Sequence, residues 1–242
     1  MAPEDLLISD LHLAAERPRT LELFLRFARE RAARARTLYV LGDLFDAWIG
    51  DDDDSALAVA VRGALRALAD AGVRIRFQAG NRDFLVGERF AAATGVELLP
   101  EAAVVDLAGQ PTLLMHGDLL CTDDVDYQQA RRLLRSPPFV ADFLARPIAA
   151  RLAIAAEYRR RSGEATSLKA EDIMDVNAAA VVDAMRAHGV RRLVHGHTHR
   201  PGRHALAVDE APAERIVLAQ WHEDGGECLR CDADGIAVEP VR

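Results

Sequence analysis

Short apolar runs alternate with longer amphipathic runs through the first half of the chain. Strands are predicted for the apolar runs DLLIS, TLYVLGD and VRIRFQAG. Helices are predicted for TLELFLRFARERAARA and SALAVAVRGALRALADAG, where apolar residues recur at helical spacing. This alternation is typical of a layered α/β fold, in which ligand sites lie at the carboxyl ends of the strands.

The pattern changes after the run PTLLMHG. Residues 123–170 predict helices alone, interrupted once at SPP, and we interpret them as a helical insertion within a single domain that spans residues 1–242. A helix (DVNAAAVVDAMRAHG) and a strand (VRRLVHGH) then resume the earlier pattern, and the last 40 residues predict short strands separated by turns.

A polar cluster follows each of five predicted strands. The clusters contain Asp10 and His12, Asp43, Asn81 and Arg82, His116, and finally His195, His197 and His199. A strand end needs only a turn residue such as Gly, Asn or Asp, yet five of the eight histidines of the chain lie in these clusters. Oxygen and imidazole donors that converge from several strand ends, without a thiolate, indicate a site for divalent metal ions.

The local sequence around these clusters suits such a site. Asp10 and His12 stand two residues apart, so that in an extended segment both side chains would point to the same side and reach one ion. Glycines at positions 42, 80, 117 and 196 allow tight turns and close backbone approach next to the clusters. His195 admits two interpretations, as a support for a ligand or as an ordinary strand residue.

Charge and composition exclude some functions. The net charge of -8 and the low aromatic content argue against a nucleic-acid surface. Such a surface needs basic residues for the phosphates and aromatic side chains on which bases can stack. Three cysteines without a second pair of zinc ligands make a structural zinc site or redox chemistry improbable. Acidic residues near the N-terminus, where a signal peptide needs basic ones, lead us to expect a cytoplasmic protein.

The five motifs together resemble the calcineurin-like metallophosphoesterases. The resemblance extends from Asp10 to His199 and implies a four-layer α/β/β/α sandwich that holds two metal ions. It places the first ion among Asp10, His12, Asp43 and His199, and the second among Asp43, Asn81, His116 and His197, with Asp43 as the bridge. Two such ions clamp a phosphoryl group and activate water for in-line attack.

The third motif departs from the common family pattern. Members usually have a histidine after the Gly-Asn pair, but here GNRD places Arg82 there. Arginine cannot act as a general acid, but it can hold phosphate oxygens bidentately. This favours a leaving group that needs little protonation, such as the second phosphate of a pyrophosphate.

Longer stretches resemble one branch of the family, the bacterial UDP-2,3-diacylglucosamine diphosphatases of lipid A biosynthesis. The stretches are ISDLHL, GDLFDAWIGDD, GNRDFL, HGDLLCTDD, RSGEATSLKAEDIMDVN and HGHTHRP. The resemblance implies manganese as the metal and cleavage at the α-phosphate, which yields UMP and 2,3-diacylglucosamine 1-phosphate. It implies catalytic roles for Asp43, Asn81, Arg82 and His116, and substrate contacts for Asn81, Arg82, Asp124, Ser162, Thr166, Lys169 and His197.

The resemblance also suggests a role for the insertion. Its apolar residues are expected to line a chamber for acyl chains: Leu133, Leu134, Phe139, Val140, Phe143, Leu144, Ile148, Leu152 and Ile154. Between positions 131 and 162 it carries eight arginines and two acids, which we expect to meet anionic head groups on the cytoplasmic face of the inner membrane, making the protein a peripheral one. Ordinary helix packing would produce the same amphipathic pattern.

Two other functions fit part of the pattern. A metallophosphoesterase for a soluble nucleotide or another phosphodiester would keep every metal ligand but have no use for an apolar insertion. A binding scaffold without catalysis would not need competent residues at all ligand positions. No obligate protein partner is predicted.

Overall fold

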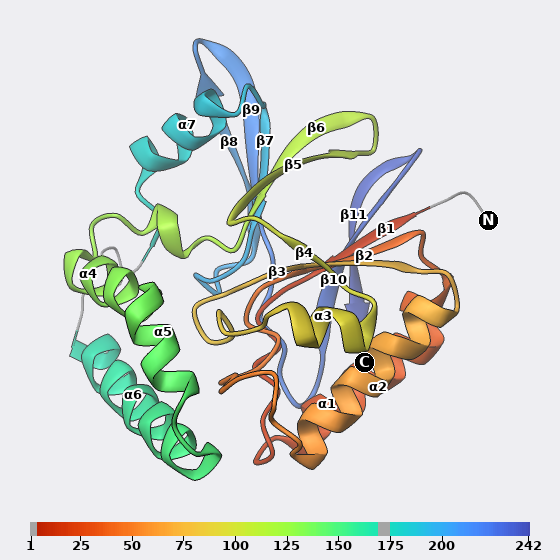
Figure 1. Ribbon diagram of the computed structural model, residues 1–242. Helices are drawn as coiled ribbons and strands as arrows, with labels where there is room; N and C mark the ends of the chain where they lie inside the picture. Colours follow the sequence, from red (N-terminus) through yellow and green to blue (C-terminus); the bar gives the residue numbers. More distant parts are fainter. Residues whose placement is uncertain (1–3, 169–174) are drawn as a thin grey trace.

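Two β-sheets form the centre of the molecule (Figure 1). The computed structural model describes residues 4–168 and 175–242, with the backbone alone for residues 161–168. The first sheet has the strand order β11-β10-β1-β2-β3-β4, with β1 to β4 parallel and β10 antiparallel to its neighbours. Its strands are β1 (Asp5–Ile8), β2 (Thr37–Leu41), β3 (Arg74–Gln78), β4 (Glu97–Leu99), β10 (Gly226–Asp232) and β11 (Gly235–Val241).

The second sheet has the order β5-β6-β7-β9-β8, in which β6, β7 and β9 are parallel. Its strands are β5 (Ala102–Leu107), β6 (Gln110–Met115), β7 (Arg192–His195), β8 (Gly202–Val208) and β9 (Ala211–Val217). The chain therefore enters this sheet before the helical segment and completes it afterwards.

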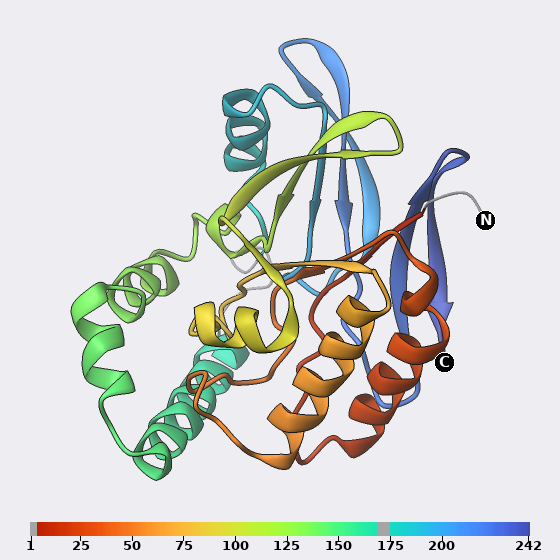
Figure 2. The ribbon, with the colours of Figure 1, turned by 45° about the vertical axis from the view of Figure 1, so that its right-hand side comes forward.

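Helices cover the outer faces of both sheets (Figure 2). Helices α1 (Pro18–Glu30), α2 (Ala56–Asp70) and α3 (Glu88–Thr94) lie on the first sheet, and α7 (Ala178–Ala187) lies on the second. Short 3-10 helices occupy Ala32–Arg34 and Asp118–Leu120. The four-layer α/β/β/α sandwich that the sequence predicts is confirmed.

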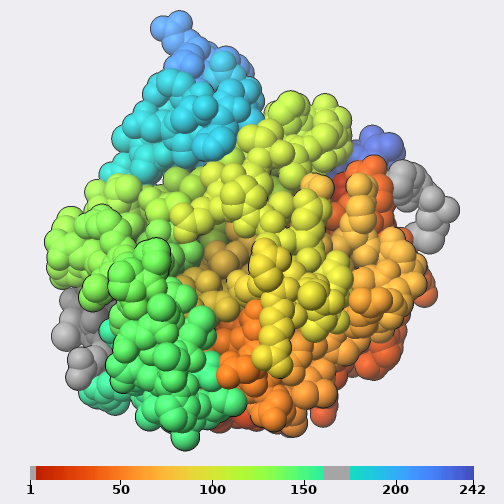
Figure 3. All heavy atoms as spheres, in the orientation of Figure 1, coloured from red at the N-terminus to blue at the C-terminus, as the bar shows by residue number. Residues whose placement is uncertain are grey.

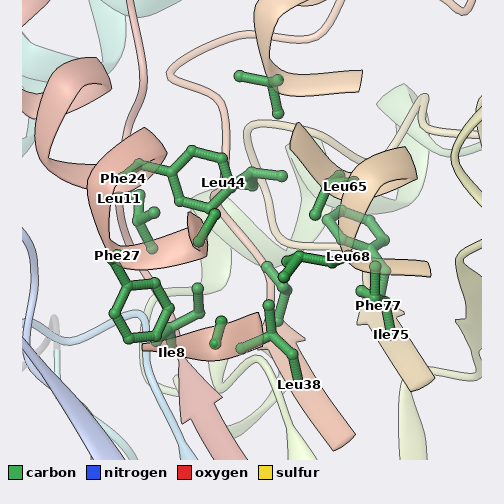
Figure 4. Packing of buried hydrophobic residues seen from close by; sticks show 14 of the residues in the cluster. Ile8, Leu11, Phe24, Phe27, Leu38, Leu44, Leu65, Leu68, Ile75 and Phe77 are labelled. Carbon is green, nitrogen blue, oxygen red and sulfur yellow. The ribbon is translucent and has the colours of Figure 1, made fainter. Parts of the chain in front are cut away.

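The strand β1 is buried on both faces, as the apolar run DLLIS suggests. Leu6 and Ile8 point to one side and pack with Phe24 and Phe27 of α1, in the cluster that Figure 4 shows. Leu7 points to the other side and lies in the cluster between the two sheets. This packing fixes the end of β1, and with it the residues that follow, against both sheets.

Helices α4 (Val125–Leu134), α5 (Pro137–Leu144) and α6 (Ile148–Leu168) form a separate group beside the sandwich, which we call the cap. The sequence predicts one interruption here, at SPP, but the structure has a second one between α5 and α6. Pro147 causes it, because proline lacks the N–H that would continue α5 and disfavours helical backbone at the residue before it. No helix in the described ranges is both long enough and apolar enough to span a membrane.

Six of the eight arginines that are expected to meet lipid head groups form ion pairs with other described residues. Arg151 is only 2% exposed and donates to the Ile49 carbonyl and to Asp52, each at 2.7 Å. The other pairs are Arg131–Asp118, Arg135–Glu101, Arg146–Asp142, Arg159–Asp46 and Arg160–Glu157. Four of these residues pair with acids outside the cap and so help to hold it against the sandwich: Arg131, Arg135, Arg151 and Arg159.

Candidate metal centre

The five polar clusters lie close together because the strands that precede them are neighbours. β1, β2 and β3 run parallel and side by side in the first sheet, and β6 and β7 do so in the second. The carboxyl ends of parallel neighbours meet at one edge of a sheet. Side chains from all five loops thus approach one another across the gap between the sheets.

Asp10, His12 and His199 form a first group of possible ligands. One ligand atom of each lies within 4.8 Å of the others. The His12 and His199 Nε2 atoms are 3.2 Å apart, and the His199 Nε2 lies 3.3 Å from Asp10 Oδ1. Three donor atoms are therefore close enough to share one cation.

Asp43 lies between this group and a second one. The second group contains Asp10, Asp43 and His116, with ligand atoms again within 4.8 Å of one another. Asp43 Oδ1 lies 3.7 Å from the His116 Nε2, and its Oδ2 lies 3.8 Å from the His12 Nε2. One carboxylate thus offers an oxygen to each group, as a bridging ligand must.

Asn81 joins the second group through its side-chain oxygen. This Oδ1 lies 3.0 Å from the His116 Nε2 and 2.9 Å from the His197 Nδ1. The other ring nitrogen of His116 is 2.8 Å from the Leu41 carbonyl, to which it donates a hydrogen bond. In the neutral ring this leaves the lone pair on Nε2, the atom that faces Asn81 and Asp43.

The backbone at these positions is unusual. Asp10, His12, Asp43, His197 and His199 all have φ between 47° and 69°, a region that L-residues avoid although Asp and His tolerate it better than most. The expectation that Asp10 and His12 belong to an extended segment is therefore wrong. The left-handed turns bring their side chains together instead, with His12 Nε2 3.9 Å from Asp10 Oδ1.

Two glycines allow the loops to touch. A Cβ atom on Gly80 would overlap the carboxylate and the backbone nitrogen of Asp43. A Cβ atom on Gly196 would overlap Ser9 and the Asp10 carboxylate. Any larger residue at either position would force the ligand loops apart.

Two supporting residues have no role in the sequence prediction. Ser9 donates to Asp10 Oδ2 at 2.6 Å and so orients that carboxylate. Asp83 accepts hydrogen bonds from the backbone nitrogens of Gly80 and Leu44, both at 2.8 Å, and joins two loops. Asp83 is the last residue of the motif GNRD, and its place in that motif could have indicated its supporting role. Ser9 is distinguished only by standing next to Asp10.

Burial and charge shift the pKa values of these groups. Burial lowers the pKa of His12 to about 4, and burial with the charge of His116 lowers the pKa of His197 to about 3, so both rings stay neutral and able to bind a cation. Burial and neighbouring carboxylates raise the pKa of Asp43 to about 8. Burial opposes a charge on His116, but Asp43 and Asp10 outweigh it and raise its pKa to about 9.

The residues fit a pair of divalent cations. Asp10 Oδ1 and His12 Nδ1 are buried and have no hydrogen-bond partner among the described residues, which is costly in a protein interior unless another ligand is present. A cation would also offset the burial and the neighbouring carboxylate charges that raise the pKa of Asp43. Carboxylate, amide and imidazole donors without thiolate suit metals such as Mn, Fe or Zn.

A cavity of about 390 Å³ adjoins this centre and extends to the cap. Asn81, Arg82 and Asp124 line it at the end nearest the strand loops, and Asp124 also caps α4 by accepting from the Tyr127 nitrogen at 3.0 Å. Apolar lining residues include Trp48, Phe84, Leu85, Leu134, Phe139, Phe143 and Ile154. In Figure 3 the green surface of the cap lies beside the yellow and orange surface of the first half of the chain.

Three predicted substrate contacts are not placed. Ser162, Thr166 and Lys169 lie outside the residues whose side chains the structure describes. Of the predicted chamber residues, Leu134, Phe139, Phe143 and Ile154 line the cavity. Leu133, Leu144 and Leu152 are instead exposed.

His195 lies behind the metal residues. It is fully buried, its Nδ1 contacts the Gly196 carbonyl at 2.8 Å, and its Nε2 lies 3.3 Å from Arg215. A Cβ atom on Gly117 would approach its ring to 2.8 Å, so the ring packs under the loop that carries His116. Its contacts are those of a residue that supports the loops.

Comparison with known proteins agrees with this geometry. The calcineurin-like phosphoesterase family profile matches residues 6–201. The chain is 50% identical over 233 residues to a UDP-2,3-diacylglucosamine hydrolase from Cellvibrio japonicus, covering 96% of this chain and 97% of the relative. It is 51% identical over 235 residues to a protein of the same name from Pseudomonas paraeruginosa, covering 97% and 98%. The family resemblance of the motifs is thus confirmed, and the chain belongs to the calcineurin-like phosphoesterase family.

Proposed function

We propose that the protein hydrolyses the pyrophosphate bond of UDP-2,3-diacylglucosamine, releasing UMP and 2,3-diacylglucosamine 1-phosphate for lipid A biosynthesis. The observation that carries this proposal is the cavity between the cap and the metal residues, which has apolar walls and includes Asn81 and Arg82. Such a cavity suits a substrate with a polar diphosphate and acyl chains. Relatives that bear this activity in their names match almost the whole chain at about 50% identity.

The proposed metal ligands are those that the motifs suggest. Asp10, His12, Asp43 and His199 would hold the first ion, and Asp43, Asn81, His116 and His197 the second. Two bound divalent cations, for which manganese is our proposal, would supply an activated water and offset phosphoryl charge. The separate contacts of the two Asp43 oxygens support its role as the bridge.

The protein's own residues would orient the substrate. Arg82 lies on the cavity wall directly after Asn81, and its backbone nitrogen donates to Asp43 Oδ1 at 2.8 Å. That hydrogen bond ties the position of the Arg82 side chain to the bridging carboxylate. From this position its guanidinium would bind the diphosphate and offset charge on the leaving phosphate. Asp124, Ser162, Thr166, Lys169 and His197 remain proposed contacts to the head group.

The cap would receive the acyl chains. We propose that residues 123–170 are a helical insertion into one domain spanning 1–242, and that Phe139 and Phe143 form part of an acyl chamber. Their rings are stacked, with centroids 6.2 Å apart, and both line the cavity. A soluble nucleotide would leave this apolar wall without a partner.

We further propose that the protein binds the cytoplasmic face of the inner membrane as a peripheral protein. Because most cap arginines are paired, exposed apolar side chains are the better candidates for this contact. Leu133 is 61% exposed and Leu152 is 53% exposed, both on cap helices. Exposed apolar residues on helices with basic neighbours favour a membrane interface.

The reaction itself provides the main test. We expect hydrolysis of UDP-2,3-diacylglucosamine with manganese in oxygen-18 water to place the label in UMP, because attack at the α-phosphorus adds water oxygen to that product. A UDP-sugar without acyl chains should react at least tenfold more slowly. Label in the sugar phosphate would reverse the direction of attack, and equal rates for both substrates would favour the soluble alternative.

Loss of one ligand should remove the second ion. We expect Asn81→Ala and His116→Ala to abolish turnover and to lower the manganese content measured by mass spectrometry, while circular dichroism stays unchanged. His222→Ala is the matched control, because His222 is exposed and distant in sequence from every cluster. A near-normal rate in either ligand variant would remove that residue from the site.

Arg82 should act mainly on the chemical step. We expect Arg82→Ala to reduce kcat by a factor that corresponds to about 2–4 kcal/mol, as for a charge-stabilising donor, with a smaller change in KM. Steady-state kinetics at saturating manganese would separate the two constants. A rise in KM with an unchanged kcat would assign Arg82 to ground-state binding instead.

Exposed cap residues should control membrane binding. We expect the double variant Leu133→Ser and Leu152→Ser to reduce co-sedimentation with anionic phospholipid vesicles several-fold. Val104→Ser is the control, because Val104 is 47% exposed but lies on β5, outside the cap. Equal recovery of the double variant and the control would contradict a cap-mediated contact.

A further inference from the structure

Helix α4 is fastened to the loop that carries His116. The Tyr127 hydroxyl donates to Asp118 Oδ2 at 2.9 Å, and Arg131 Nε donates to the same oxygen at 2.7 Å. The side-chain amide of Gln128 donates to the Asp118 carbonyl at 2.8 Å. Asp118 is two residues beyond His116, so the first turns of α4 fix this part of the loop.

The end of α4 contacts a second ligand loop. Arg135 Nη2 donates to the Gly80 carbonyl at 2.8 Å, and its Nη1 donates to Glu101 Oε1 at 2.6 Å. The guanidinium lies 5.3 Å from the centre of the Phe84 ring. The side chain is only 16% exposed, so salt and water weaken these contacts little.

The Gly80 peptide is held on its other side as well. Its nitrogen donates to Asp83 Oδ1 at 2.8 Å, and its Cα has no room for a side chain because Asp43 packs against it. The carbonyl that Arg135 binds belongs to the peptide group that joins Gly80 to Asn81. Rotation of that peptide would displace the Asn81 side chain, whose oxygen lies between His116 and His197.

The cap therefore makes different kinds of contact with the two groups of possible ligands. Arg159 of α6 contacts Asp46, which lies 3.8 Å from the His12 ring in the first group. Arg135 of α4 contacts the backbone of the second group directly. Groups that hydrogen-bond around a metal ligand orient that ligand, and their loss typically weakens metal binding.

We propose that Arg135 is a positioning residue for the second cation, because its hydrogen bond to the Gly80 carbonyl orients Asn81. This inference rests on the proposed two-cation centre. Arg135 also lines the substrate cavity, but its positioning role acts through the Gly80 carbonyl and needs no contact with the ion. Through this hydrogen bond the cap would support the metal centre, in addition to forming a wall of the substrate cavity.

The experiment is a manganese titration followed by calorimetry on the full chain. We expect Arg135→Met to weaken one of two manganese affinities by about 10–100-fold, the range for loss of a residue that supports a ligand, and to leave the other affinity unchanged. The spin-coupled manganese signal in electron paramagnetic resonance should weaken in parallel. At low manganese kcat should fall with little change in KM, and excess manganese should restore it.

Arg132→Met is the matched control, because Arg132 is on the same helix and exposed. Arg135→Lys should recover part of the affinity, since an ammonium can donate one hydrogen bond to the same carbonyl. Equal affinities in Arg135→Met and the native chain, equal loss at both sites, or no recovery with lysine would each overturn the positioning role. Failure of the native chain to bind two manganese ions would instead refute the proposed function.

Discussion

Burial of three carboxylates close together is the constraint around which the site is built. Asp10, Asp43 and Asp83 follow neighbouring strands and are fully or almost fully buried. Backbone nitrogens satisfy Asp83, whereas Asp10 Oδ1 accepts no hydrogen bond from the part of the chain that the structure describes and lies 3.3 Å from the His199 Nε2. Such an arrangement is unfavourable in a protein interior, and bound cations would offset its cost.

The fold must also support an unfavourable backbone. Left-handed conformations cost L-residues about 1–2 kcal/mol each, and five proposed ligands adopt them. Their sum is comparable to the roughly 5–15 kcal/mol by which a typical domain is stable. The strands before the ligands are buried on both faces, as Leu6 and Leu7 of β1 show, and this packing supplies the stabilisation.

Sequence reasoning identified candidate ligands that the structure brings close together, but it did not predict their local geometry. Asp10, His12 and Asp43 were identifiable because polar residues at strand ends stand out against apolar runs. Their positive φ values were not, since Asp and His occur in extended and left-handed segments alike. Pro147 was a signal for the second break in the cap. The prediction missed this break because the apolar residues around Pro147 recur at helical spacing.

Charge patterns were the least reliable guide, because charge is counted along the chain while its partners are set by the fold. Arg151 and Arg159 appeared to belong to a basic surface, yet each pairs with an acid about 100 residues away. A net local charge of the cap thus says little about its solvent-facing surface. Exposed apolar residues are better evidence for an external contact than a count of arginines, because their position on the surface is read from the fold.

The contacts of the cap would link binding of the proposed substrate to binding of the proposed cations. The cavity lies between α4 and α6, and these two helices contact opposite halves of the metal centre through Arg135 and Arg159. Residues of both helices line the cavity, so a ligand that fills it would contact both. If the substrate binds better when the cap contacts the metal loops, the same contacts must make the cations bind more tightly. By reciprocity, cations that order these loops must favour substrate binding.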